Sequence, residues 1–123
     1  MTTTADIAAA FFTDYAAALL ARDEDEVARM YAVPALVLFP GRAIAVSDRR
    51  QTAEFFASSW EQYDGVAEAE PAVTVLASTA DAIWADVRWS FDGAERERFC
   101  YQLARSGDQW QVVVLTPLDH VVP

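Results

Sequence analysis

The sequence predicts an α+β fold, in which three N-terminal helices pack on a curved, mainly antiparallel sheet of four to six strands. Two observations support this. Apolar residues recur at helical spacing up to about residue 64, and strand-like alternation follows Pro71. Short turn sequences separate the later strand candidates, so consecutive strands should pair as hairpins. The 123 residues have room for one core, and we expect a single domain over 1–123.

The first half of the chain is expected to be helical. Thr3 or Thr4 can cap a first helix, because short polar side chains accept hydrogen bonds from the free N–H groups of a first turn. Asp23 can begin a second helix and Ser47 a third. Gly65 can end the third helix in the left-handed conformation. The helices are expected over about residues 4–21, 23–31 and 47–63.

Six segments rich in strand-forming residues are bounded by proline, glycine or short polar turns. Asp92-Gly93 gives the clearest turn signal, since this dipeptide favours the type I′ turn of a two-residue hairpin loop. Such a turn would place Arg88 opposite Glu97. The strands are expected over about residues 35–39, 43–46, 73–77, 82–91, 95–105 and 110–116, the last four forming an antiparallel meander.

The hairpin at Asp92-Gly93 predicts which side chains share a sheet face, because side chains alternate along a strand. A bulge would exchange the faces of one strand. With a regular register, one face carries Trp89, Arg98, Cys100 and Gln102, and the opposite face carries Trp84, Phe99, Tyr101 and Leu103.

The charge of the chain argues against two classes of partner. Its formal net charge is −10, whereas proteins bind nucleic acid and anionic membranes through clustered positive charge. The longest apolar stretch, residues 32–46, is interrupted by Pro34, Pro40 and Arg42, so no membrane span is expected.

Few residues of the chain are suited to covalent or metal chemistry. The sequence has no lysine, which excludes Schiff-base catalysis. Cys100 is its one cysteine and His120 its one histidine, so we expect neither a disulfide nor a metal site, and no pattern implies a cofactor. The start of the chain lacks the features of a secretory signal peptide, and we expect a cytoplasmic location.

The order of elements and three short motifs carry a resemblance to a known architecture. The motifs are DYAAAL with the Arg22-Asp23 that follows it, Gly41 before the third helix, and GDQWQVVVL near the C-terminus. With these features the chain resembles the nuclear transport factor two-like superfamily, the cone-shaped fold of ketosteroid isomerases, scytalone dehydratases and polyketide-cyclase-like proteins. The resemblance covers nearly the whole chain. It implies that the sheet face carrying Trp89 lies beneath the helices and that the opposite face forms a homodimer.

The resemblance also allows catalytic positions to be carried over from the ketosteroid isomerases. Their first-helix tyrosine falls on Tyr15, their proton-moving base on or near Phe39, and their protonated acid on Gln102. Phe39 cannot accept a proton and Gln102 offers an amide, so isomerase activity of that type is not expected. The dehydratase pattern needs a histidine–aspartate pair, which His120 near the C-terminus does not provide.

Two hypotheses for function therefore remain open. The first is a small-molecule-binding protein of the polyketide-cyclase-like branch, whose cofactor-free pocket takes a small apolar or weakly acidic molecule and offers room for isomerase, cyclase or dehydratase chemistry. The second is a non-enzymatic dimeric interaction module with a filled core. The alternative for Trp60 and Trp89 is that they only pack in the core. The alternative for Arg98 is that it lies in solvent at the open end of the sheet. The pocket is predicted to include Tyr15, Trp60, Trp89, Arg98, Cys100 and Gln102, and the dimer interface Trp84, Phe99, Tyr101 and Leu103.

Overall fold

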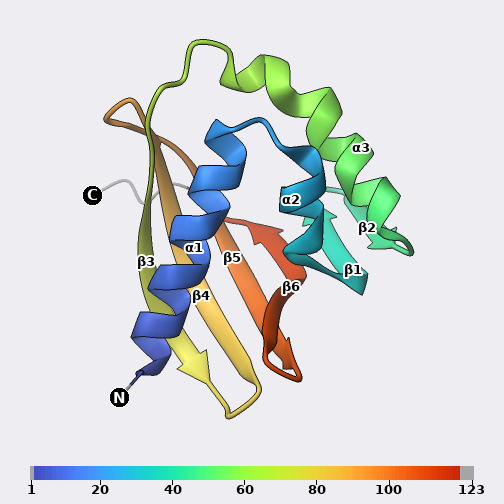
Figure 1. The fold of residues 1–123 in the computed structure, drawn as a ribbon, viewed down its shortest axis with the longest axis vertical. Helices are drawn as coiled ribbons and strands as arrows, with labels where there is room; N and C mark the ends of the chain where they lie inside the picture. Colours follow the sequence, from blue (N-terminus) through green and yellow to red (C-terminus); the bar gives the residue numbers. More distant parts are fainter. Residues whose placement is uncertain (1, 120–123) are drawn as a thin grey trace.

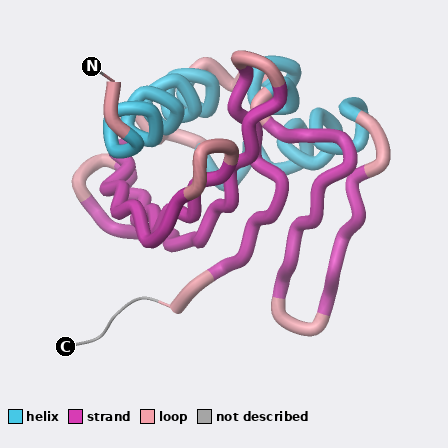
Figure 2. Tube along the Cα trace, turned by 90° about the horizontal axis from the view of Figure 1, so that it is seen from below, coloured by secondary structure: helices cyan, strands magenta, loops and turns pink. Residues whose placement is uncertain are grey.

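A curved six-stranded sheet forms the back of the molecule, and the helices lie on one side of it (Figures 1 and 2). The structure is a computed structural model that describes residues 2–119. We call the sheet face toward the helices the concave face and the opposite one the outer face. The strand order is β2-β1-β6-β5-β4-β3, with β1 and β6 parallel and the other neighbours antiparallel. The strands are β1 (Tyr31–Phe39), β2 (Arg42–Val46), β3 (Ala69–Ser78), β4 (Ala82–Phe91), β5 (Ala94–Ser106) and β6 (Gln109–Pro117). The α+β class and the predicted meander are confirmed.

Each α-helix begins at a side-chain cap. Thr3 accepts a hydrogen bond from the first turn of α1 in a capping box, and Asp23 does the same for α2. The third helix is capped by Asp48, one residue after the predicted Ser47. Its last predicted turn is a 3₁₀ turn, which we label η1. The bounds are α1 (Thr4–Leu20), α2 (Glu24–Arg29), α3 (Arg49–Ser59) and η1 (Trp60–Tyr63).

Two strands begin earlier than predicted, each before a proline. β1 includes Pro34, which lies in the register shift between Tyr31 and Leu36 and therefore has no partner in the ladder with β6. β3 includes Pro71, which is tolerated because β3 is an edge strand of the sheet.

The turn between β4 and β5 has the predicted type I′ character, but the strands do not keep the predicted register. Asp92 and Gly93 both have positive φ values, 51° and 86°. The two residue pairs nearest the turn are also as predicted. Beyond them the register shifts by one residue, so that Trp89 pairs with Glu97 and Arg96 becomes the extra residue of a bulge.

This bulge reverses the faces of β5. Burying a large apolar side chain stabilises the fold by about 1.5–3 kcal/mol, more than the roughly 1 kcal/mol of a lost ladder hydrogen bond. The concave face therefore receives the apolar side chains of β5, and Tyr101 and Leu103 are 1% and 0% exposed. Trp84 remains on the outer face, because β4 itself is regular. The predictions that place Arg98, Cys100 and Gln102 beneath the helices, and Phe99, Tyr101 and Leu103 on the outer face, are wrong.

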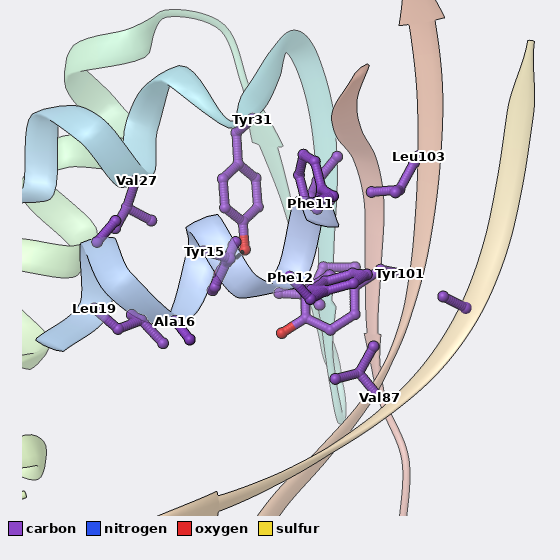
Figure 3. Close-up of a cluster of buried hydrophobic side chains, with 14 of the residues drawn as sticks. Phe11, Phe12, Tyr15, Ala16, Leu19, Val27, Tyr31, Val87, Tyr101 and Leu103 are labelled. Atoms are coloured by element: carbon purple, nitrogen blue, oxygen red, sulfur yellow. Dashed lines mark hydrogen bonds between the residues drawn. The ribbon is translucent and has the colours of Figure 1, made fainter. Parts of the chain in front are cut away.

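The core lies between α1 and the concave face. Figure 3 shows Phe12 of α1 against Tyr101 of β5, and their ring centroids are 4.8 Å apart. The residues favoured as core from the sequence, Phe11, Phe56 and Val112, are all buried.

Candidate ligand-binding site

A cavity of about 340 Å³ opens between the concave face and the C-terminal end of α3. α1 contributes Tyr15, β4 and β5 contribute Trp89 and Tyr101, and α3 and η1 contribute Phe56 and Tyr63. Most of the wall is therefore aromatic. The volume of the cavity lies within the range of small-molecule sites, which starts at about 300 Å³.

Of the six residues predicted to line a pocket, Tyr15 and Trp89 line this cavity. Trp60 is not among its lining residues. The Trp60 ring packs between those of Phe56 and Tyr63, with centroid separations of 6.1 and 5.9 Å, and its Nε1 donates to Glu24 Oε2 over 3.4 Å. Trp60 thus supports the cavity wall from behind.

The other three predicted residues, Arg98, Cys100 and Gln102, face away from the cavity. Arg98 forms a two-pronged ion pair with Asp86, with Nε–Oδ1 and Nη2–Oδ2 distances of 3.0 and 2.5 Å. This hydrogen bonding lowers the pKa of Asp86. Burial raises the pKa of the Cys100 thiol, which disfavours a thiolate. Arg98 therefore cannot anchor a ligand in the cavity.

The three positions carried over from the ketosteroid isomerases also divide between the cavity and the outer face. Tyr15 and Phe39 line the cavity, whereas Gln102 lies on the outer face. Gln102 lies outside the cavity because the bulge at Arg96 reverses the faces of β5.

Two buried hydrogen bonds hold polar atoms within the aromatic wall. Tyr15 Oη and Tyr31 Oη are 2.7 Å apart, and Trp89 Nε1 donates to Tyr101 Oη over 2.9 Å. Burial raises the pKa of Tyr15, Tyr31 and Tyr101. These hydroxyls therefore stay neutral, and they can donate or accept hydrogen bonds without acting as charged groups.

Glu97 is the functional candidate that sequence reasoning missed. Among the described residues that line the cavity, it supplies the carboxyl group. Tyr63 Oη donates to Glu97 Oε1 over 3.3 Å. Burial raises the pKa of Glu97, and burial together with the charge of Glu97 raises that of Tyr63. A carboxyl with a raised pKa in a cleft is a typical feature of functional sites.

The sequence did contain a signal for the position of Glu97. Phe99, Tyr101 and Leu103 follow it at every second position, and this alternation indicates one buried face of β5. Trp89 and its apolar neighbours occupy odd positions of β4. In a regular two-residue hairpin, odd-numbered residues of β4 lie opposite even-numbered residues of β5. The odd-numbered residues of both strands can therefore share a face only if the hairpin contains one extra residue. Strand alternation, given more weight than the turn, would have predicted the bulge.

At its mouth the cavity continues toward the β1–β2 hairpin. Phe39 and Phe55 form the rim, with ring centroids 6.1 Å apart, and exposed Arg42 lies beside them. A second cavity of about 300 Å³ lies between α3 and the hairpin, and it shares five lining residues with the first: Tyr31, Arg42, Phe55, Phe56 and Leu115. The two chambers are thus neighbours around Phe55.

Arg22 ties η1 to the end of α1. It has a positive φ of 54°, which ends α1, and its guanidinium donates to the carbonyl oxygens of Leu19 and Leu20. The same group donates to the carbonyl oxygens of Tyr63 and Val66. Arg22 therefore holds the backbone from which Tyr63 reaches Glu97.

Two negative findings apply to the described residues. Within 2–119, no group of three or more histidine, cysteine, aspartate or glutamate side chains is arranged to hold a metal ion. None of the helices described there has the length and apolar character to cross a membrane. His120, considered from the sequence as a catalytic group, lies outside the described residues.

Sequence comparison identifies the family. The NTF2-like protein family DUF6841 matches residues 5–120. The chain belongs to this family. Among curated proteins, none matches this NTF2-like protein in sequence.

Solved structures agree with the fold of this NTF2-like protein. An NTF-2 like protein of unknown function from Shewanella oneidensis MR-1 has a TM-score of 0.76 at 12% identity, over 95% of this chain and 100% of that one. A domain of unknown function with a cystatin-like fold from Nostoc punctiforme has a TM-score of 0.70 at 18% identity, over 98% and 81%. A de novo designed protein with a curved β-sheet has a TM-score of 0.64 at 16% identity, over 92% and 97%. These likenesses concern the fold alone, since one fold hosts many functions.

Proposed function

We propose that this NTF2-like protein binds a small, largely apolar molecule in the cavity beneath α3. One observation carries the proposal: an open volume of about 340 Å³ has an aromatic wall interrupted by the carboxyl of Glu97. Apolar walls with a few well-placed polar groups are usual for small-molecule sites. The open volume also argues against the alternative of a filled core. A weakly acidic ligand would depend on Arg42 at the mouth, because Arg98 faces away.

Proton transfer to or from a bound ligand, without a cofactor, would fall to Glu97. A general base needs a pKa near the working pH, and burial moves the pKa of Glu97 in that direction. The neutral tyrosines Tyr15 and Tyr31 would then act as hydrogen-bond donors toward a ligand oxygen. Isomerase, cyclase and dehydratase reactions all use a group that moves a proton together with hydrogen-bond donors to a substrate oxygen.

A thermal-shift screen of small apolar ketones, phenols, amines and acids tests the proposal, because a ligand that binds the folded state raises Tm. Ser59→Trp places a large ring at the cavity wall and should abolish the shift. Ser58→Trp is the matched control, since Ser58 is the exposed neighbour and both hydroxyls donate to the carbonyl oxygen of Phe55. Equal shifts in both variants, or no shift with any compound class, would count against a ligand cavity.

A homodimer through the outer face is a second, independent proposal. After the correction of β5, this face retains Trp84. Register places Trp84 beside Gln102, Gln102 beside Val114, and Val114 beside Leu36, which gives one row across four strands. Leu36 is 37% exposed. Three of the four residues in this row are apolar, and apolar side chains gathered on a sheet face are typical of interfaces.

A further inference from the structure

We propose that the ligand of this cavity is a hydrophobic cation, in which an ammonium group is attached to an apolar body and lies against Glu97 beside a band of aromatic side chains. This inference rests on the proposed function and specifies its ligand class. Three features of the cavity support it: a carboxyl without an ion-pair partner, the aromatic rings near that carboxyl, and the positions of the arginines.

The carboxyl of Glu97 has a neutral partner. Its hydrogen bond comes from Tyr63 Oη, and none of the ion pairs among residues 2–119 involves Glu97. Glu97 is partly buried, and burial without a cationic partner disfavours its ionised form, which raises the pKa of the carboxyl. An ammonium group in the cavity would supply the missing charge.

Aromatic side chains form a continuous band around this carboxyl. Glu97 lies opposite Trp89 in the sheet and two residues before Phe99, so three neighbouring side chains share the concave face. Ring-centroid distances along the band are 5.3, 6.3, 5.6, 5.9 and 5.9 Å between successive members. The members, in order, are Tyr63, Phe91, Trp89, Tyr15, Tyr101 and Phe99.

Aromatic faces attract ammonium groups through the ring quadrupole, and cages of aromatic rings are a common means of binding quaternary amines. Neutral apolar ligands gain from the same rings but gain nothing from the carboxyl. An anionic ligand would be repelled by it. The combination of band and carboxyl therefore selects for positive charge.

The arginines near the cavity do not offset this preference. Arg22 is occupied with four carbonyl oxygens of the chain, and Arg98 is paired with Asp86 on the outer face. Arg42 is exposed at the mouth of the cavity, opposite Phe39 in the β1–β2 hairpin, and none of the ion pairs among residues 2–119 joins it to Glu97. The net charge of −10 also favours the approach of cations over anions.

The test compares two ligands of matched shape, 3-hydroxyphenyltrimethylammonium and its neutral analogue 3-tert-butylphenol, by isothermal titration calorimetry at pH 8. We expect the cation to bind at least about tenfold more tightly. Glu97→Gln should remove most of this preference while leaving the neutral analogue bound. Glu61→Gln removes one negative charge from exposed η1, outside the cavity, and should leave the preference unchanged.

A pH series provides a second readout. Burial raises the pKa of Tyr15, Tyr31, Tyr63 and Tyr101, so these phenols stay neutral up to pH 8. Burial also raises the pKa of Glu97 above its ordinary value of 4.5, so the series starts below that value and follows the ionisation of this carboxyl as the pH rises. The affinity for the cation should rise with pH in the wild type and not in Glu97→Gln. The affinity for 3-tert-butylphenol should not change.

The outcomes separate the two proposals. Equal binding of both ligands, or tighter binding of the neutral one, would overturn the cation inference and leave the proposed function intact. A cation preference that persists in Glu97→Gln would also overturn it. Failure of both ligands to bind, together with no hit from any compound class in the thermal-shift screen, would overturn both.

Discussion

Tyr63 Oη donates a hydrogen bond to Glu97 Oε1 over 3.3 Å and so joins the 3₁₀ turn after α3 to strand β5 inside the cavity. The bond places a carboxyl among aromatic rings, where its ionised form is poorly solvated. Such a group lowers stability and is retained where function needs it. Its effect on stability can be measured without knowing the ligand.

Glu97→Gln is expected to raise Tm at pH 8 and to have little effect at pH 4. Burial raises the pKa of Glu97 above its ordinary value of 4.5 in the folded protein, so the folded chain holds the proton more tightly than the unfolded chain. The free energy of unfolding therefore falls as pH rises from about 4.5 through the raised pKa. An amide cannot ionise and avoids this loss. Thermal unfolding at several pH values between 4 and 8 measures the difference.

Tyr63→Phe is the matched control for this pH dependence. It removes the hydrogen bond that partly counteracts the effect of burial, but it keeps the carboxyl. The loss of stability with rising pH should therefore persist in Tyr63→Phe and disappear in Glu97→Gln. If Tyr63→Phe also removed the pH dependence, the assignment of that dependence to Glu97 would be wrong.

Arg22→Met is expected to lower the free energy of unfolding by about 1–3 kcal/mol, the range for hydrogen bonds made by a charged group. The variant loses the donors to the carbonyl oxygens of Tyr63 and Val66, which tie η1 to α1. Arg29→Met is the control, because Arg29 makes an exposed ion pair with Glu26, and such helix pairs contribute under about 0.5 kcal/mol. Urea unfolding of both variants measures the comparison, and equal losses would contradict the role assigned to Arg22.

The sequence was sufficient to predict the class of fold, the helices and the meander, because caps, turns and periodicity are local signals. Asp92-Gly93 predicted its own turn type correctly. The turn alone could not predict the register beyond Ser90, because a bulge depends on which face of β5 packs against α1. The alternation of Phe99, Tyr101 and Leu103 indicates that face in the sequence, and the contact between Phe12 and Tyr101, far apart in the chain, establishes it in the structure.

The candidate site was less predictable than the fold for the same reason. Tyr15 and Trp89 could be placed, since α1 and β4 are regular elements. The one-residue shift at Arg96 removed Arg98 from the predicted pocket and brought Glu97 into it. A single local irregularity thus places a carboxyl in the cavity wall where a guanidinium was predicted.

Deletion of Arg96 tests this account of the bulge. Without its extra residue, β5 can pair regularly with β4 while Glu97, Phe99 and Tyr101 stay on the concave face. We therefore expect a folded protein with near-native circular dichroism. Deletion of Cys100 instead forces one part of β5 to turn outward, and losing the burial of two large side chains should cost more than roughly 3 kcal/mol. Equal stability of the two deletions would contradict the register.

The row on the outer face makes a prediction about oligomeric state. If Trp84 and Leu36 lie in a homodimer interface, arginine at both positions should yield monomers, because it places unpaired charges in an apolar contact. The monomer should remain folded, since neither side chain points toward the helices. Sedimentation velocity of the wild type and the Trp84→Arg/Leu36→Arg double variant measures the change.

Leu76→Arg is the control for this outer-face row. Leu76 is 58% exposed, but it lies in the register shift of edge strand β3, outside the row. Its replacement should therefore leave the dimer intact, while the double variant separates it. A wild type that sediments as a monomer would refute the homodimer outright. A dimer that survives the double variant would move the interface to another surface, because two buried arginines at a sheet contact are too costly for association to persist.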